Sequence, residues 1–357
     1  MAKTKILAKE RRIALGLDVD AKAIVVVALD VTNGEIVYQG RLSHQREDWQ
    51  RFLAHFPGSE IWACYEAGYT GYHLCRMLCE LGVDGRIVAP SQVPKSVTSR
   101  QQKTDRRDAL TLAQLYFHPP RSFVRIPTEQ DEQDRQLLRT REQLARDKTR
   151  IQNRIKALFA FHHVAWPVLA DSTGHWSQAA QQTLRTMTLP TPLRVCLDAQ
   201  LDTLDGLYRQ IRRFNAHLVA LSQTERYHDR CALLRHIPGV GLLTAMAFLL
   251  EVFRPEDFLT AEALACHVGF TCCEWSSGGR RRQGHITHFG PAILRRMFVE
   301  AAWTWVRKDP DAKRRFETIS VSSKRKKIAI VAMARRLAIV MWAMTVRQQD
   351  YAYRWAA

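Results

Sequence analysis

The chain has 357 residues, 46% of them hydrophobic and 25% charged, so it is long enough for two or three domains with ample cores. Its eight cysteines form no paired C-x-x-C motif, which excludes a zinc ribbon and a disulfide framework. The formal net charge of +18 predicts an anionic partner. This charge grows along the chain, from +3 over residues 1–120 to +6 over 121–254 and +9 over 255–357.

The two ends of the chain indicate neither a signal peptide nor a membrane span. Residues 1–12 are basic but lack an apolar h-region. The apolar run from Ile328 to Val346 has Arg335 and Arg336 at its centre, which makes a spanning helix costly. We therefore expect that run to be a buried or nucleic-acid-facing helix. We expect the cysteines to be buried free thiols in a reducing cytoplasm.

The first third of the chain predicts an α/β sheet with one hairpin. Asn33-Gly34 is the strongest short signal for a hairpin, and apolar segments flank it on both sides. The predicted strands are a run from Gly16 to Asp20 that continues through Ala23 to Leu29, then Ile36–Tyr38, Ile61–Tyr65 and Arg86–Ala89. The predicted helices are Glu47–Phe56, Tyr72–Leu81 and one that opens at Asp105.

Acidic residues mark three of these predicted elements. Asp105 and Asp108 are three residues apart, on one face of the first turn of a helix. Asp18 and Glu66 belong to apolar strands, where a carboxylate is costly unless it is paired or binds a cation. Hard cations such as Mg²⁺ or Mn²⁺ prefer oxygen ligands, and two of them clamp the reacting oxygens of a phosphodiester. We predict that the four acids form such a metal site.

For the two helix acids a second interpretation stays open. Asp105 and Asp108 also fit a solvated helix face that is paired with Arg106 and Arg107. The strand positions of Asp18 and Glu66 favour the metal site.

The middle of the chain predicts two long helices with narrow apolar seams. After Pro119-Pro120, a seven-residue repeat of apolar residues runs from Asp131 to about Phe161, and a second heptad pattern includes the polar Asn215. A polar residue at a seam position fixes register. The sequence leaves open whether the helices pair within one chain or between chains. The seam residues are Leu137, Leu144, Ile151 and Leu158 in the first helix and Leu197, Leu201, Leu204, Tyr208, Ile211 and Leu218 in the second.

The last third predicts contacts with a phosphate backbone. Residues 234–245 have the form of a helix-hairpin-helix turn, in which Gly239 and Gly241 let backbone N–H groups approach a phosphate. A plain loop between core helices is the alternative. Basic runs, whose alternative is a solvated surface, add to the predicted interface. They comprise Arg280, Arg281 and Arg282, and Lys324, Arg325, Lys326 and Lys327.

Three motifs together resemble the DEDD-type insertion-sequence transposases of the IS110 group, which are related to the Piv-like DNA invertases. These are Gly16-Leu17-Asp18, Tyr65-Glu66-Ala67-Gly68 and Lys103-Thr104-Asp105-Arg106-Arg107-Asp108-Ala109. In that family a serine before a glycine, ahead of a basic patch, is the nucleophile. The match gives that role to Ser277, with Ser276 as the less favoured neighbour and an ordinary flexible turn as the alternative. The sequence departs from the family pattern at His288-Phe289-Gly290-Pro291.

The resemblance implies a fold, a site and partners. It implies an RNase H-like, RuvC-type domain over residues 1–122, with Asp18, Glu66, Asp105 and Asp108 as its metal tetrad. A coiled-coil dimerisation region over 123–230 and a helical transposase domain over 231–357 follow. The implied partners are donor and target DNA, a structured guide RNA and further copies of the chain in a homodimer or homotetramer. The implied place is the bacterial cytoplasm, at the nucleoid.

The predicted function is that of a DNA transposase or recombinase with a serine nucleophile. Two alternatives stay open. One is a metal-dependent nuclease or junction resolvase that uses water, and the other is a nucleic-acid-binding protein without catalytic activity.

Overall fold

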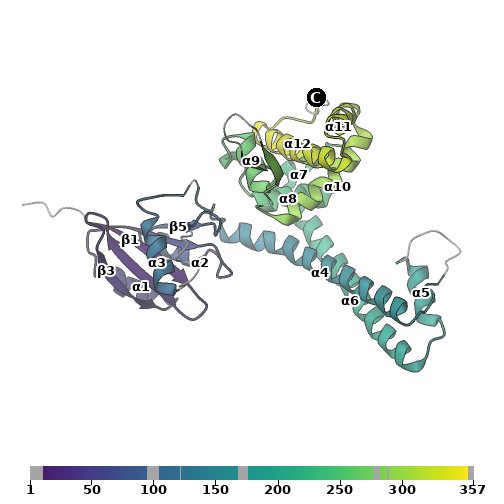
Figure 1. Cartoon of the computed structure of the whole chain (residues 1–357), viewed down its shortest axis with the longest axis horizontal. Coiled ribbons are helices and arrows are strands. Elements are labelled where there is room, and N and C mark those ends of the chain that lie inside the picture. Colours follow the sequence, from purple (N-terminus) through teal and green to yellow (C-terminus); the bar gives the residue numbers. More distant parts are fainter. Residues whose placement is uncertain are drawn as a thin grey trace, which may run out of the picture. The chain divides into compact units, whose positions relative to one another are not determined.

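The computed structural model describes residues 11–94, 104–120, 122–167, 176–275, 282–287 and 289–352. The chain divides after Thr128 into two compact units, 1–128 and 129–357 (Figure 1). The first unit is a sheet with helices, and the second is helical apart from one short hairpin.

A five-stranded mixed sheet forms the first unit. Its strand order is β3-β2-β1-β4-β5, with β1 antiparallel to β2, β2 antiparallel to β3, and β1 parallel to β4, which is parallel to β5. The α/β class predicted for this part is confirmed. The strands are β1 (Arg12–Val19), β2 (Ile24–Asp30), β3 (Ile36–Leu42), β4 (Glu60–Glu66) and β5 (Asp84–Val88).

The prediction of one continuous strand from Gly16 to Leu29 is wrong. The structure has two antiparallel strands, β1 and β2, with a reversal between them at residues 20–23, so the sheet has two hairpins. The Asp20 N–H donates to the Ala23 carbonyl oxygen at 3.2 Å and closes that reversal. Both strands are buried on both faces, so no polar alternation marks where one ends and the other begins.

Helices cover both faces of the sheet. Leu17 and Tyr65 point to the face on which α1 (Arg46–Leu53) and α2 (His73–Glu80) pack. Ala14 and Val27 point to the other face, against α3 (Asp105–Gln114). The three helices begin within a residue of their predicted starts, because their apolar residues recur at helical spacing.

The second unit begins with an antiparallel pair of long helices and continues into a compact helical core. Its first elements are α4 (Glu129–Phe161), α5 (Gln178–Thr186), α6 (Thr191–Ser222), α7 (His228–Arg235), α8 (Leu242–Val252), the 3-10 turn η2 (Pro255–Asp257) and α9 (Ala261–Val268). A hairpin follows, and three helices end the unit: β6 (Cys272–Glu274), β7 (Gln283–Ile286), α10 (Ala292–Lys308), α11 (Pro310–Ser323) and α12 (Lys326–Arg347).

The two predicted seams meet inside one chain. Gln152 of α4 donates to the Tyr208 hydroxyl of α6 at 3.1 Å, and Arg141 donates to Asn215 at 3.1 Å, which fixes the antiparallel register of the pair. Asn215, the polar residue at a seam position, thus bonds directly to the partner helix. In the C-terminal half of α4 the buried apolar residues are Ile151, Ile155 and Phe159. Two residues of the predicted seam, Leu144 and Leu158, are only half-buried.

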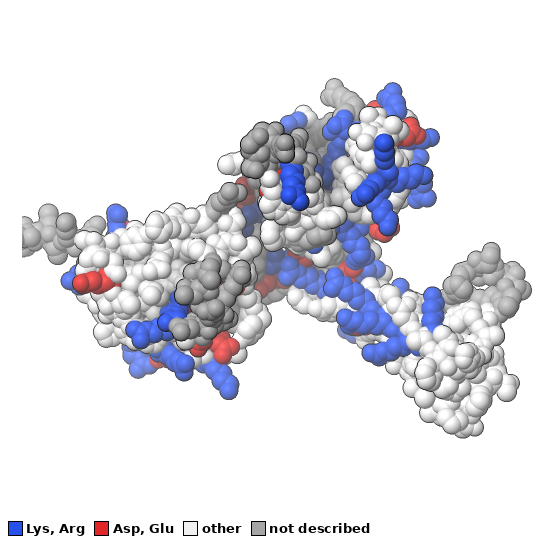
Figure 2. Space-filling view, in the orientation of Figure 1, with Lys and Arg blue, Asp and Glu red and all other residues white. Residues whose placement is uncertain are grey.

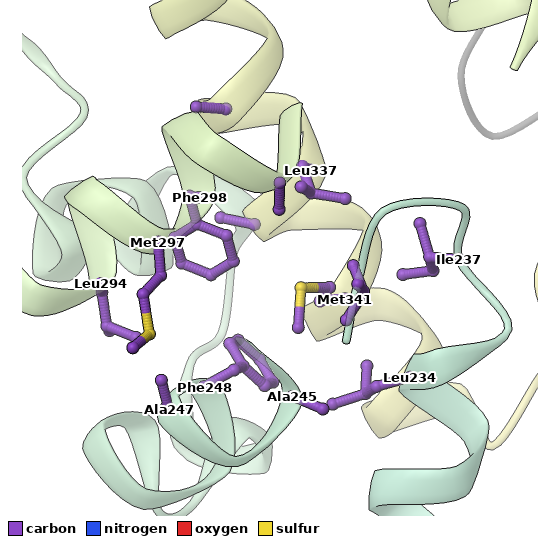
Figure 3. Packing of buried hydrophobic residues seen from close by; sticks show 14 of the residues in the cluster. Leu234, Ile237, Ala245, Ala247, Phe248, Leu294, Met297, Phe298, Leu337 and Met341 are labelled. Atoms are coloured by element: carbon purple, nitrogen blue, oxygen red, sulfur yellow. The ribbon is translucent and has the colours of Figure 1, made fainter. Parts of the chain in front are cut away.

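The C-terminal core is built around α8 and α12. Figure 3 shows Phe248 of α8 and Phe298 of α10 side by side, with Leu337 and Met341 of α12 beside them. Helix α12 is long and apolar enough to cross a membrane, but 56% of its most apolar 18-residue window is buried in this core. The interpretation of the run from Ile328 to Val346 as a buried helix is confirmed.

All eight cysteines are free thiols. Cys64, Cys75 and Cys231 are buried, as predicted, but the prediction of burial is wrong for four exposed cysteines: Cys79, Cys196, Cys266 and Cys272. Burial raises the pKa of the Cys64 thiol to about 12 and that of the Cys75 thiol to about 12, which keeps both thiols protonated and unreactive at neutral pH.

Candidate active site

Asp18 and Glu66 lie side by side at the carboxyl ends of the two central parallel strands. The last paired residues of β1 and β4 are Leu17 and Tyr65, and the next residue on each strand is one of the two acids. Side chains alternate along a strand, so both acids point away from the face of Leu17 and Tyr65 and toward the face that α3 covers. Ligands of α/β sheets commonly bind at this end of parallel strands.

Helix α3 places its first turn over that same face. Thr104 caps the helix, because its hydroxyl accepts a hydrogen bond from the Arg107 N–H at 3.4 Å. A Cβ added to Gly16 would lie 1.8 Å from the carbonyl oxygen of Ala109, so the two backbones touch there. Asp108 directly precedes Ala109, and Gly16 is two residues before Asp18. The glycine therefore lets the Asp108 turn approach the strand that carries Asp18.

Asp105 faces a cleft on the side of β2 and β3. The cleft has a volume of about 530 Å³, and Val25, Thr104 and Arg41 are among its lining residues. Val25 is the register partner of Asp18, so the cleft opens at the same end of the sheet. Arg41 lies 3.9 Å from Asp105, and both side chains are more than 60% exposed, so the pair adds little stability.

Arg41 was not predicted from the sequence as part of this site. It is 64 positions before Asp105 on an edge strand, and only the sheet register brings it there. A lone arginine in a strand of alternating burial gives no local signal of such a position.

A hydrogen-bonded link joins the loops that follow the two acidic strands. The Tyr69 hydroxyl donates to the Asp20 carboxylate at 2.6 Å, and the Ala21 N–H donates to that same carboxylate at 2.8 Å. These two hydrogen bonds lower the pKa of Asp20. The link fixes the turn after Asp18 to the loop after Glu66, so it supports the adjacency of the two strand ends.

Strand register makes Asp18 and Glu66 neighbours, but the four acids of the predicted tetrad do not form a closed ligand shell. Within the described ranges, no group of three or more His, Cys, Asp or Glu side chains is gathered closely enough to hold a metal ion. The carboxylate oxygens of Asp18 and Glu66 lie on one face of the sheet, at the ends of β1 and β4. Such oxygen ligands fit the chemistry of a hard divalent cation.

The two glycines of the predicted helix-hairpin-helix turn differ in their surroundings. Gly239 has a φ of +95°, and a Cβ there would lie 2.7 Å from the Ala301 carbonyl oxygen of α10, so packing requires this glycine. Gly241 precedes the first turn of α8, is exposed, and has no atom within 4 Å of an added Cβ. Of the two, only Gly241 has open space beside it.

The predicted basic run Lys324, Arg325, Lys326 and Lys327 is exposed and extends from the turn after α11 into the first turn of α12. We call the antiparallel pair of α4 and α6 the arm. In the view of Figure 2, lysine and arginine side chains gather along this arm and over the α11–α12 end of the core. Cations at the start of a helix oppose its dipole, so an anion at this turn would be stabilised.

Two family models match the chain. A DEDD-type transposase model matches residues 15–164, and the model of the transposase IS116/IS110/IS902 family matches residues 231–317. The chain belongs to the IS116/IS110/IS902 family of transposases. It is thus an enzyme that acts on DNA, as predicted.

Relatives with a transposase description cover most of the chain. The transposase for insertion sequence element IS1533 of Leptospira borgpetersenii is 29% identical over 82% of this chain and 85% of its own. A putative transposase, y4qE, of Sinorhizobium fredii is 27% identical over 95% of this chain and 90% of its own. The transposase for IS1111A of Coxiella burnetii is 24% identical over 94% and 90%.

The matched regions of this transposase contain its predicted site residues. Asp18, Glu66, Asp105 and Asp108 lie in the first region, and Ser277 lies in the second. Ser277 and its neighbour Ser276 are outside the described residues, as are Arg280 and Arg281. Arg282 is exposed at the start of the second strand of the β6–β7 hairpin, where its carbonyl oxygen accepts a hydrogen bond from the Trp275 N–H at 2.9 Å.

Proposed function

We propose that this transposase cleaves and rejoins DNA strands with a divalent-metal site on its N-terminal sheet and a serine nucleophile in its C-terminal unit. The metal ligands are Asp18, Glu66, Asp105 and Asp108, and the nucleophile is Ser277. The observation that carries the proposal is the register of β1 and β4, which sets Asp18 beside Glu66 on the face covered by α3.

The four carboxylates are the groups that would hold Mg²⁺ or Mn²⁺. When bound between them and a DNA phosphate, the cation polarises the phosphate and stabilises the leaving oxygen. The protein's own part is to present the acids from three rigid elements. Gly16 allows α3 to approach β1, and Thr104 fixes the first turn of that helix.

The serine step conserves the energy of the phosphodiester. The Ser277 hydroxyl oxygen forms a bond to phosphorus, the bond from that phosphorus to one deoxyribose oxygen breaks, and the released oxygen takes up the hydroxyl proton through solvent. Attack by a deoxyribose hydroxyl of another strand reverses the step and joins that strand to the phosphate. No water is consumed, so the number of phosphoester bonds is the same before cleavage and after rejoining.

A structured guide RNA and further copies of the chain complete the proposal, on the strength of the family resemblance. The net charge of +18 and the exposed cations of the α11–α12 turn support contacts with donor DNA, target DNA and RNA backbones. The proposed assembly is a homodimer or homotetramer. A metal-dependent nuclease that uses water is the second candidate, because the tetrad by itself would support either reaction.

A denaturing gel separates the two candidates. The full chain is incubated with Mg²⁺, an end-labelled DNA carrying an end of the element, and RNA transcribed from the flanking non-coding region. A covalent protein–DNA adduct is expected for the wild type and for Ser276→Ala, and it is expected to vanish with Ser277→Ala, with Asp108→Asn and in excess chelator.

Asp84→Asn is the matched control, since Asp84 is an exposed acid of the same sheet, paired with Arg86 at 2.7 Å and outside the tetrad. An adduct that survives Ser277→Ala would show that Ser277 is not the nucleophile. Cleavage without any adduct would favour the nuclease that uses water.

A further inference from the structure

A hollow between α11 and α12, in the helical unit, adjoins a second hollow that lies along α11. One has a volume of about 400 Å³ and the other of about 390 Å³, and they share Arg315 and Ile319 of α11. Helix α12 contributes Arg335, Arg336 and Ile339 to the larger hollow. We call these two hollows the arginine groove.

Cations outnumber anions in the larger hollow. Three arginines line it, and its one acid, Glu262 of α9, lies 3.5 Å from Arg335 with a side chain that is 75% exposed. Arg335 also has a buried Nε atom with no hydrogen-bond acceptor among the described residues. In the second hollow, Arg314 is already paired with Asp311.

Arg315 and Arg336 face each other at like charge. Burial lowers the pKa of Arg336, and the charge of Arg315 lowers it further. Within the described part of the chain, Arg315 has no ion-pair partner. The charge of Arg315 disfavours the charged form of Arg336, and an anion bound to Arg315 beside Arg336 would offset that repulsion.

Part of the lining of the larger hollow is apolar, and this part narrows the class of anion. It includes Ile319, Ile339 and Val340, which we call the apolar floor. A duplex offers phosphates on its outside and keeps its bases stacked within, so an apolar floor gains nothing from it. An unpaired nucleotide carries a flat apolar base next to its phosphate and matches both parts of the groove.

We propose that the arginine groove binds one unpaired nucleotide of a single strand, with its phosphate on Arg315 and Arg336 and its base on the apolar floor. The occupant is a nucleotide within single-stranded DNA or RNA. The site is independent of the metal tetrad and of Ser277, so it is tested by binding alone and stands or falls separately from the proposed reaction.

The test is fluorescence anisotropy of the full chain without divalent metal, at one fixed salt concentration. The probes are a fluorescein-labelled 12-nucleotide single strand, the same strand with abasic tetrahydrofuran units in place of its nucleotides' bases, and the strand annealed as a duplex. The first and third probes are made in DNA and in RNA, to show which strand the groove accepts.

The wild type is expected to bind the single strand about tenfold more tightly than its abasic version, because burying about 55 Å² of base surface against aliphatic side chains produces an effect of about this size. The double variant Arg315→Gln with Arg336→Gln is expected to lose about tenfold in affinity for the single strand and to keep less than about a twofold preference over the abasic strand.

The matched control is Lys326→Gln with Lys327→Gln, which removes the same charge from exposed positions in the first turn of α12. This control variant is expected to bind all probes more weakly by one common factor. It is expected to keep the preference for the single strand over its abasic version. A wild type without preference for bases over abasic units would overturn the proposal, even if the groove variant failed to fold. So would equal losses for groove and control variants on every probe.

Discussion

Acidic side chains of the sheet unit and of the helical unit lie in opposite surroundings. Asp18, Glu66, Asp105 and Asp108 are exposed or half-exposed at one end of the sheet. In the helical unit three acids of α4 and α8 are buried and paired with arginines. Asp131 pairs with Arg226, Glu142 with Arg141 and Arg296, and Glu251 with Arg139.

This difference separates buried acids that pair with arginines from acids at the more exposed end of the sheet. Arg139 donates two hydrogen bonds of 2.8 Å to Glu251, and such a pair already satisfies the carboxylate. In the sheet unit, Arg41 approaches Asp105 only at 3.9 Å and at high exposure. We therefore expect changes at the sheet acids to alter activity and changes at the buried acids to alter stability.

The largest expected effect is on catalysis. Asp18→Asn should lower strand cleavage by about 10²–10³-fold or more, because it removes a charged ligand of the cation that would stabilise the reacting phosphate. Its melting temperature should stay that of the wild type. Cleavage is measured on end-labelled DNA and melting by circular dichroism, with Asp84→Asn as the control. Normal cleavage by Asp18→Asn would remove it from the metal site.

A change at a buried acid of the helical unit should instead lower the melting temperature. Glu142→Gln leaves Arg141 and Arg296 without their shared counter-charge, which should cost about 3 kcal/mol in the free energy of unfolding. In a unit of this size that corresponds to a fall of roughly 6–10 °C in melting temperature. Asp202→Asn is the control, because its pair with Arg185 is exposed on the acid's side. Equal melting of the two variants would contradict the comparison.

The next prediction concerns the apolar seam between α4 and α6, where a change should alter stability. Ile211→Ala should lower the free energy of unfolding by about 2 kcal/mol, since it empties space between α6 and α4. Because both helices belong to one chain, the loss in melting temperature should be independent of protein concentration. Val219→Ala removes exposed methyl groups from the same helix and serves as control. A loss that varies with concentration would show that the seam lies between chains.

The smallest expected effect concerns the link between the two strand-end loops. Tyr69→Phe removes the hydroxyl that lowers the pKa of Asp20, so the Asp20 carboxyl should titrate at higher pH. A carboxyl with a lowered folded pKa adds stability above its ordinary value of 3.8 and loses it as pH falls through the folded pKa.

The stability difference between wild type and Tyr69→Phe should therefore be present at neutral pH and vanish in acid. Carboxyl chemical shifts and denaturant unfolding at several pH values measure it. Tyr38→Phe should leave the titration of Asp20 unchanged. A difference that persisted in strong acid would have a cause other than this hydrogen bond.

Local signals predicted most of the elements. Heptad spacing of apolar residues located α4 and α6, a long apolar run located α12, and an Asn-Gly pair marked the turn between β2 and β3. The reversal at residues 20–23 was missed because neither glycine nor proline occurs there and both strands are apolar. Local patterns fail where burial hides the alternation that would mark the end of a strand.

The sequence by itself determined the acids of the sheet, the helix that opens at Asp105, the two heptad seams and the basic C-terminal third. These follow from residue type and spacing, which act over one or two turns of chain. Only the tertiary structure decided that Asp18 stands beside Glu66, that α4 and α6 pair within one chain, and that Arg315 meets Arg336 in a groove. Those neighbours are tens of residues apart, and strand register and helix packing bring them together, neither of which a local pattern encodes.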